Sequence, residues 1–208
     1  YISANKNLGQ NFLIDENVVD TIISSAQVNN NDLVIEIGPG LGTLTSKLLE
    51  TAGKVIAVEL DPKMINILKD RFHFYNNFEL INEDILKVNL KKLILDEQHS
   101  EEEKLYTVKV IANLPYYITT PIVMKLLEDK LPIESITVMV QKEVADRLTA
   151  IPGEKNTGAI TYCVFYYCEP QEILLVPNSS FIPAPEVNSE VIKLNIREKP
   201  PIDLKNEK

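Results

Sequence analysis

The sequence feature that most constrains the fold is a glycine-rich loop between an apolar segment and an amphipathic one. Residues 33–37 are almost all apolar, Gly38-Pro39-Gly40-Leu41-Gly42 follows them, and a helical pattern resumes over residues 44–50. A buried strand, a glycine loop and a helix in this order form the first half of a nucleotide-binding βαβ unit. Glycines let the backbone approach a ligand closely and present N–H groups at the start of a helix. The sequence therefore predicts a nucleotide-containing ligand at this loop.

The next segment supports this prediction and narrows the kind of ligand. Residues 54–58 form a second apolar run that ends on Glu59, roughly 20 residues beyond the glycines, where such folds place a carboxylate for ribose hydroxyls. The loop itself reads G-x-G-x-G, whereas dinucleotide enzymes carry G-x-G-x-x-G. This spacing favours a ligand that has no pyrophosphate.

Apolar runs and helical patterns alternate along the rest of the chain. We expect strands over residues 33–37, 54–59, 78–81, 107–112, 136–140, 173–176 and 191–196. We expect helices over residues 16–26, 44–50, 62–72, 89–96, 121–127 and 142–150. Residues 159–167 are rich in β-branched and aromatic side chains, which suits a strand, but an apolar helix fits them too. The alternation predicts an α/β fold with a mostly parallel sheet and helices on both faces.

Glycine-rich or polar segments follow four successive strands of this predicted sheet. They are the glycine loop, Glu59, Asp84 with Ile85, and Asn113-Leu114-Pro115-Tyr116. Ligands of such sheets bind at the carboxyl ends of the strands, so we expect the four segments to meet at one edge. The Asn113 amide and the Tyr116 ring would hold a flat, amine-bearing ring by its edge and its face. Asp84 would accept a hydrogen bond from an adenine amine, although a capped turn explains this aspartate equally well.

Charge and cysteine content exclude several classes of protein. The chain of 208 residues has a net charge of −9, whereas nucleic-acid-binding domains usually carry a basic surface. Any nucleic-acid site must therefore be local, and Lys142, Arg147 and Lys155 are candidates for phosphate contacts.

No apolar run reaches the roughly 20 residues that a transmembrane helix needs. Cys163 and Cys168 indicate neither a metal site nor a disulfide framework, so a reducing cytoplasm is expected.

The motifs in combination point to one family. They are Gly9-Gln10-Asn11-Phe12-Leu13, Glu36-Ile37-Gly38-Pro39-Gly40-Leu41-Gly42, Glu59, Glu83-Asp84-Ile85, Asn113-Leu114-Pro115-Tyr116, Gln141-Lys142-Glu143 and Phe181-Ile182-Pro183-Ala184-Pro185-Glu186-Val187-Asn188-Ser189. With them the chain resembles the S-adenosylmethionine-dependent ribosomal RNA adenine N6,N6-dimethyltransferases from about residue 8 to residue 196. Leu114, followed by Tyr117-Ile118-Thr119-Thr120-Pro121, resembles the bacterial small-subunit branch.

The resemblance implies a Rossmann-like class I methyltransferase fold, with a seven-stranded, mostly parallel sheet and helices on both faces. It makes residues 159–167 a helix. The methyltransferase domain would span residues 1–196, and residues 197–208 would form a polar tail. Because the chain begins at Tyr1 rather than at methionine, we expect a fragment. Because only a short tail follows residue 196, we expect the family's small helical C-terminal domain to be absent from it.

The resemblance also implies roles for individual residues. Those expected to contact the cofactor S-adenosylmethionine are Gln10, Asn11, Leu13, Gly38, Gly40, Glu59, Leu60, Asp84, Ile85 and Asn113. Gly38 and Gly40 would line its methionine moiety, Glu59 would bind the ribose, and Asp84 and Ile85 the adenine. No metal is expected.

Four residues are expected to act on the target adenine. We expect the Asn113 side-chain oxygen and the Leu114 backbone carbonyl to accept the two hydrogens of adenine N6. Tyr116 and Phe181 would stack on the two faces of the base. We expect Phe181 to be exposed within the proline-rich segment 178–185, and ordinary packing under that segment is the alternative for it.

The expected activity is methyl transfer from S-adenosylmethionine to adenine N6 in small-subunit ribosomal RNA, with S-adenosylhomocysteine as the second product. The expected partner is ribosomal RNA within a small-subunit assembly intermediate. We expect a cytoplasmic monomer with no membrane attachment. Two alternatives stay open: a large-subunit methyltransferase that confers macrolide resistance, and a non-catalytic RNA-binding assembly factor.

Overall fold

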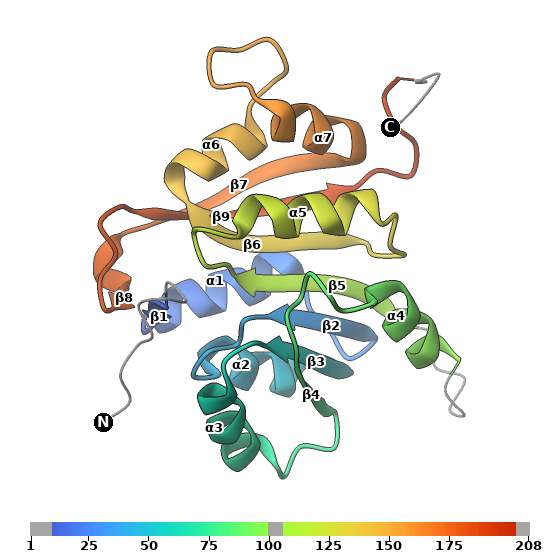
Figure 1. The fold of residues 1–208 in the computed structure, drawn as a ribbon, viewed down its shortest axis with the longest axis vertical. Coiled ribbons are helices and arrows are strands. Elements are labelled where there is room, and N and C mark those ends of the chain that lie inside the picture. The colour runs from blue at the N-terminus through green and yellow to red at the C-terminus, as the bar shows by residue number, and fades with distance from the viewer. Residues whose placement is uncertain (1–9, 100–105, 203–208) are drawn as a thin grey trace.

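The protein forms one seven-stranded sheet with helices on both faces and a separate two-stranded sheet at one end (Figure 1). Its structure is a computed structural model that describes residues 10–99 and 106–202. Gly9 of the N-terminal motif lies outside the described residues, as do the first residues of the predicted domain and the last residues of the predicted tail. The α/β class predicted from the sequence is confirmed.

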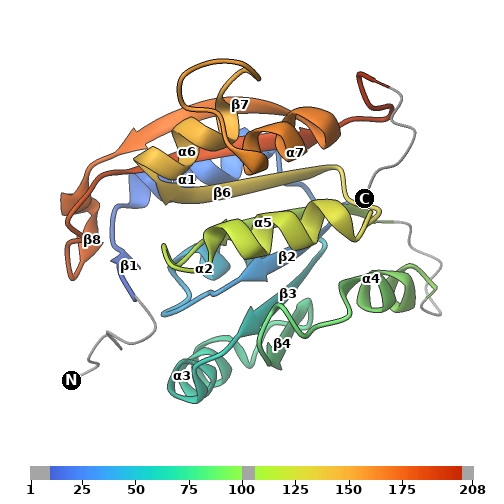
Figure 2. The same ribbon diagram turned by 45° about the horizontal axis from the view of Figure 1, so that its top comes forward.

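The large sheet has the strand order β4-β3-β2-β5-β6-β9-β7. The first five strands in this order are parallel, and β9 and β7 run antiparallel to their neighbours. The strands are β2 (Asp32–Ile37), β3 (Lys54–Glu59), β4 (Phe78–Asn82), β5 (Thr107–Asn113), β6 (Ser135–Gln141), β7 (Cys168–Val176) and β9 (Ser189–Ile196). The two-stranded sheet joins β1 (Phe12–Leu13) to β8 (Phe181–Ile182), and both views place these strands side by side (Figures 1 and 2).

Helices α1–α3 supply buried apolar side chains to one face of the sheet, and α4–α7 supply them to the other. Their bounds are α1 (Glu16–Ala26), α2 (Thr43–Thr51), α3 (Pro62–Phe72), α4 (Leu90–Gln98), α5 (Thr119–Glu128), α6 (Lys142–Thr149) and α7 (Ala159–Tyr167). Side-chain caps explain where two of them begin, because Asp15 accepts a hydrogen bond from the Asn17 N–H and Asp61 accepts one from the Lys63 N–H.

The order of the parallel strands positions the site. The chain runs from β2 outward to β3 and β4 and then returns to β5, on the other side of β2. Doubly wound sheets open a crevice where the strand order reverses in this way. Ile37 pairs with Ala112 at the ends of β2 and β5, so Gly38 and Asn113 follow next to each other. A side chain on Gly38 would begin 4.0 Å from the Asn113 backbone oxygen.

The structure corrects the predicted strands in two places. β7 begins at Cys168 rather than at residue 173, and it contains Pro170, which has no N–H to donate. An edge strand tolerates this loss, and β7 is the last strand of the sheet. The two-residue strands β1 and β8 have no counterpart in the predicted pattern because they are too short to show a period.

Residues 159–167 form helix α7 rather than a strand. The helix packs against α5, α6 and β7, so more than one side of it is covered, and this explains why its sequence is apolar nearly all round. Within residues 10–99 and 106–202, no helix combines the length and the apolarity that crossing a membrane would require.

Candidate active site

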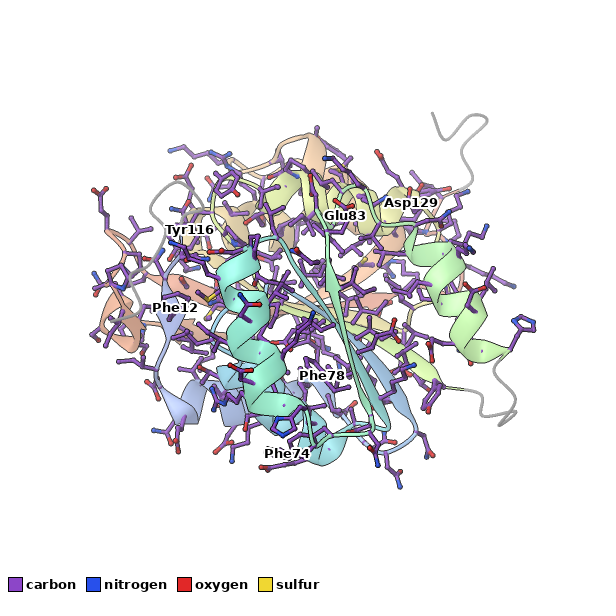
Figure 3. All side chains as sticks on the ribbon, turned by 60° about the horizontal axis from the view of Figure 1, so that its bottom comes forward. Phe12, Phe74, Phe78, Glu83, Tyr116 and Asp129 are labelled. Atoms are coloured by element: carbon purple, nitrogen blue, oxygen red, sulfur yellow. The ribbon has the colours of Figure 1, made fainter. Side chains whose placement is uncertain are left out.

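Every residue expected to contact the cofactor or the target adenine lines one pocket at the carboxyl ends of the parallel strands. The lining includes Gln10, Asn11, Leu13, Gly38, Gly40, Glu59, Leu60, Asp84, Ile85, Asn113, Leu114, Tyr116 and Phe181. Figure 3 shows Phe12 and Tyr116, which also belong to the lining, on the same side of the molecule. The expectation that four strand-end segments meet at one edge is therefore confirmed.

The glycine loop lies in contact with the N-terminal segment. Gly40 has a φ of +57°, and a Cβ at this position would lie 3.3 Å from Cδ1 of Phe12. Both facts favour glycine, since L-residues rarely adopt this conformation and the space is already filled. The Gly40 N–H points to the next strand, where it donates a hydrogen bond of 3.2 Å to Oε2 of Glu59.

Glu59 is held firmly at the end of β3. Only 6% of it is exposed. Its Oε1 accepts from the Asp61 N–H at 2.8 Å, and its Oε2 accepts from the Gly40 N–H. Burial raises the pKa of this carboxyl, while the backbone hydrogen bonds lower it in part. The result is an oriented carboxylate in the pocket wall, which suits a donor pair such as the two hydroxyls of a ribose.

Asp84 serves a turn and leaves one oxygen open. Its Oδ1 accepts a hydrogen bond of 3.0 Å from the Leu86 N–H, so the capped-turn interpretation is correct. Among the described residues, nothing donates to Oδ2. Since Asp84 also lines the pocket beside the buried side chain of Ile85, the turn holds a free acceptor next to an apolar wall. The two interpretations of this aspartate are compatible.

The pairing of β1 with β8 brings the N-terminal and C-terminal motifs together, and we call this pair of strands the strap. Phe12 pairs with Ile182, and Leu13 pairs with Phe181. The Ser180 hydroxyl reinforces the pairing by donating to Oδ2 of Asp15 at 2.9 Å. The strap therefore lays the N-terminal motif over the edge of the pocket.

Gln10 is also fixed against the pocket, by a hydrogen bond of 3.1 Å from its Nε2 to Oδ2 of Asp61. Asp61 is the residue whose backbone N–H holds Glu59. The predicted ribose carboxylate and the N-terminal motif thus share one anchor.

Asn113 and Leu114 present two hydrogen-bond acceptors at the end of β5. The Asn113 Nδ2 donates to the Asn11 backbone oxygen at 3.4 Å, and the Leu114 N–H donates to the Met139 oxygen at 3.1 Å. Within the described part of the chain, neither Oδ1 of Asn113 nor the Leu114 carbonyl accepts a hydrogen bond. Both residues line the pocket, so the site offers adjacent acceptors that the fold leaves unused.

The structure corrects the expected exposure of Phe181. Only 3% of this side chain is exposed, whereas 59% of the neighbouring Ile182 is. Pairing with Leu13 turns Phe181 inward, where it belongs to the same apolar cluster as Val176. Because Phe181 still lines the pocket, packing and pocket lining are both properties of this ring.

Sequence reasoning assigned no role to Glu36, which also lines the pocket. Only 1% of the residue is exposed, and its Oε2 has no hydrogen-bond partner among the described residues. Burial raises the pKa of this carboxyl to about 8, the nearby Thr45 hydroxyl lowers it, and the charge of Glu59 raises it further. The sequence feature that could have identified Glu36 is a carboxylate inside an otherwise apolar strand.

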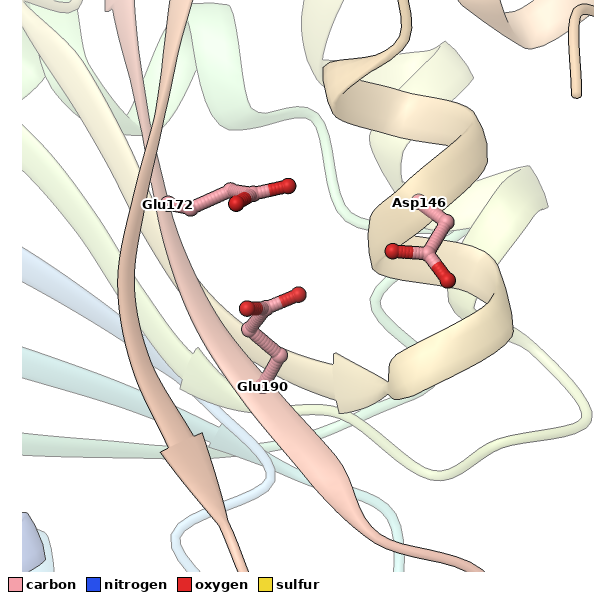
Figure 4. A group of neighbouring side chains, drawn as sticks. All are labelled: Asp146, Glu172 and Glu190. Carbon is pink, nitrogen blue, oxygen red and sulfur yellow. The ribbon is translucent and has the colours of Figure 1, made fainter.

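Two of the three candidate phosphate-binding residues are already paired with carboxylates. Lys142 contacts Asp146 and, at 3.0 Å, Glu190, and these hydrogen bonds raise its pKa. Figure 4 shows Asp146 and Glu190 facing each other together with Glu172. Arg147 pairs with Glu143 in the same way, so a phosphate at either position would compete with a carboxylate partner.

Lys155, the third candidate, is exposed and forms no ion pair with the described residues. It lies in the loop between α6 and α7.

Comparison with known proteins adds three matches. The model of a family described as "Ribosomal RNA adenine dimethylase" matches residues 2–208. Ribosomal RNA small subunit methyltransferase A of Alkaliphilus oremlandii is 52% identical over 204 residues, which cover 97% of this chain and 69% of that protein. Among solved structures, a dimethyladenosine transferase from Plasmodium falciparum has a TM-score of 0.78 at 34% identity, covering 90% of this chain and 64% of that one.

A fourth match bears on the ribosomal subunit. The 23S rRNA methyltransferase ErmE has a TM-score of 0.78 at 28% identity, covering 93% of this chain and 73% of that one. Over a similar share of the chain, the sequence identity to the small-subunit enzyme is nearly twice the identity to ErmE.

Proposed function

The chain belongs to the ribosomal RNA adenine dimethylase family, and we propose on this basis that it transfers methyl groups from S-adenosylmethionine to N6 of adenines in small-subunit ribosomal RNA. Each transfer forms a bond between N6 and the methyl carbon, breaks the sulfur–methyl bond of the cofactor and releases one N6 proton to water, so two transfers give N6,N6-dimethyladenosine and two molecules of S-adenosylhomocysteine. The observation that carries the proposal is the pair of unused acceptors, Asn113 Oδ1 and the Leu114 carbonyl, in the same pocket as Glu59 and the glycine loop.

The residues present fit the cofactor. Gly40 has a positive φ and lies in close contact with Phe12, so the loop presents backbone rather than a side chain to the pocket that it lines. Glu59 would hold the ribose hydroxyls, Gly38 and Gly40 would line the methionine moiety, and Leu60 would cover the ribose edge. Asp84 Oδ2 would accept from the adenine amine beside Ile85. The bound cofactor supplies a methyl group on a sulfonium, which is a leaving group that needs no acid or metal.

Asn113 and Leu114 prepare the nucleophile. The lone pair of adenine N6 is delocalised into the ring and is a poor nucleophile. When Asn113 Oδ1 and the Leu114 carbonyl accept its two hydrogens, the lone pair is turned out of the ring plane and towards the methyl donor. Positioning of this kind is worth on the order of 7–11 kcal/mol of the barrier. The proposed catalysis is therefore orientation and polarisation.

Tyr116 and Phe181 would receive the base after it leaves its stack. Extrusion of a base costs a few kcal/mol, and stacking on an aromatic ring returns about 1–3 kcal/mol per base. The place of Phe181 in the pocket lining supports this role. Gln10, Asn11 and Leu13 would close the pocket from the strap side.

The remaining assignments follow from the substrate. We place the protein in the cytoplasm, as a monomer that acts on ribosomal RNA within a small-subunit assembly intermediate. The methyltransferase domain would comprise residues 1–196. Arg197 is still attached to it, since its backbone N–H donates to the Tyr167 oxygen at 2.8 Å, and the polar tail would continue to residue 208.

One experiment separates the proposed function from its rivals. Unmethylated small and large ribosomal subunits are incubated with the chain and with methyl-labelled S-adenosylmethionine, and the product is mapped by nuclease digestion. We expect label in N6,N6-dimethyladenosine of the small-subunit RNA. Label in the large-subunit RNA would favour the resistance-enzyme alternative, and label in neither would favour a non-catalytic assembly factor.

A further inference from the structure

One hydrogen bond joins the proposed base-stacking residue Tyr116 to the opposite end of the chain. The Tyr116 hydroxyl and the Ser189 Oγ lie 2.8 Å apart, across 73 positions of sequence. Tyr116 lies in the loop between β5 and α5, outside regular structure, and is half-buried. Among the described residues, the Tyr116 hydroxyl has no other hydrogen-bond partner.

Ser189 is buried between two neighbouring strands of the sheet. It is the first residue of β9, where it pairs with Gln141 of β6 on one side and Val176 of β7 on the other. Only 1% of it is exposed. Because Ser189 is held between two strands, its hydrogen bond ties the Tyr116 hydroxyl to the sheet.

Ser189 also ends the segment that begins with Phe181. Phe181 is held by its pairing with Leu13, and Ser180 before it is held by Asp15. At the other end, the Asn188 backbone oxygen accepts from the Lys142 N–H at 3.0 Å. Both ends of this segment are thus anchored, with Phe181 at one and the partner of Tyr116 at the other.

From this arrangement we propose that Ser189 is a positioning residue for the target adenine, because its hydroxyl holds the Tyr116 ring in the wall of the pocket that Phe181 also lines. The inference rests on the proposed function, which gives both rings their stacking role. A ring fixed before the base arrives loses less conformational freedom on binding, so the hydrogen bond improves binding of the base without contacting it.

Three variants test this inference by steady-state methyl transfer to unmethylated small subunits. Ser189→Ala removes the hydroxyl from the sheet side. Tyr116→Phe removes the other hydroxyl of the pair, on the loop side, and keeps the aromatic ring and the sheet unchanged. The third variant combines both changes. We expect each single change to raise KM for the subunit, or to lower kcat/KM, by about two- to tenfold, with unchanged affinity for S-adenosylhomocysteine in calorimetry. The double variant should have the same kcat/KM as the less active single variant, because both changes remove the same hydrogen bond.

Ser135→Ala is the matched control. Ser135 is also a buried serine that pairs with β9, but it lies at the far end of β6, and its hydroxyl has no hydrogen-bond partner among the described residues. Its kinetics should equal those of the unaltered chain.

Two outcomes overturn the inference. An unaltered kcat and KM in Ser189→Ala would remove the positioning role, and so would fully additive losses in the double variant. In both cases an active unaltered chain leaves the proposed function standing. An unaltered chain that methylates no small subunit would overturn the proposed function and this inference together.

Discussion

The side chain of Asn113 donates a hydrogen bond to the backbone oxygen of Asn11, with 3.4 Å between nitrogen and oxygen, across 102 positions of sequence. The contact uses the amide nitrogen and therefore leaves the amide oxygen for another partner. It also makes the orientation of this amide depend on the N-terminal motif, which the strap holds in place. The catalytic and cofactor-binding parts of the proposed site are in this way one connected structure.

Replacing Asn113 by alanine should abolish methyl transfer, because one of the two acceptors for adenine N6 is lost. We expect affinity for S-adenosylhomocysteine to stay within an order of magnitude of its original value, as measured by calorimetry. Asn195→Ala is a suitable control, since Asn195 lies at the far end of β9 opposite Ser135. Turnover of Asn113→Ala equal to that of the control would rule out the proposed role.

Replacing Glu59 by alanine should weaken binding of S-adenosylhomocysteine by about tenfold or more, since hydrogen bonds to a charged group are lost. The backbone N–H groups of Gly40 and Asp61 lose their acceptor as well. Calorimetric titration measures the change. Glu79→Ala serves as the control, because Glu79 lies on β4 and pairs with Lys54 outside the pocket. Equal affinities in the two variants would disprove the ribose assignment.

Replacing Gly40 by alanine should weaken cofactor binding and lower stability by about 1–2 kcal/mol, because a left-handed conformation disfavours a Cβ. The new methyl group would also press on the Phe12 ring at 3.3 Å. Urea unfolding and calorimetry report the two effects. Gly158→Ala introduces the same methyl group where nothing lies within 4 Å. If both variants behave alike, close approach at Gly40 is not required.

Glu36 should make the stability of the protein depend on pH. Burial raises its pKa to about 8, whereas the unfolded chain has a value of about 4.3. The folded protein therefore binds this proton more tightly, and the stabilisation is complete below about pH 4 and is lost as the pH rises to about 8, at up to roughly 1.4 kcal/mol per pH unit.

Glu36→Gln keeps the shape of the side chain and cannot ionise, so it should lose this dependence. We expect the free energy of unfolding of Glu36→Gln, relative to that of the unaltered chain, to increase steadily from pH 5 to pH 8 in urea titrations. A constant difference between the two proteins over this range would show that Glu36 does not titrate there.

Local patterns in the sequence were sufficient for most of the fold. Apolar runs located the parallel strands, and the expected helix start at residue 62 is confirmed, because α3 begins at Pro62. The pattern was insufficient where tertiary contacts decide the outcome. Residues 159–167 are covered on several sides, so their composition alone does not separate helix from strand. Pro170 lies within β7, where an edge position tolerates a residue without an N–H.

The site was predictable to the extent that its residues lie at the carboxyl ends of strands. Glu59 and Asn113 are the last residues of β3 and β5, and Asp84 comes two residues after β4. Parallel topology brings such positions together. The burial of Phe181 was not predictable in this way, because it depends on pairing with Leu13 far away in the sequence. The partnership of Tyr116 with Ser189 is of the same kind.

The strap has a consequence for how the enzyme is made. Residues 12–13 can pair only after residues 181–182 have been synthesised. The glycine loop and Asn113 are synthesised well before these residues. A nascent chain that has exposed its first 150 or so residues therefore contains most of the proposed cofactor-binding residues but not Phe181. Under the proposed function, the pocket gains its second stacking ring only after residue 181 has been synthesised.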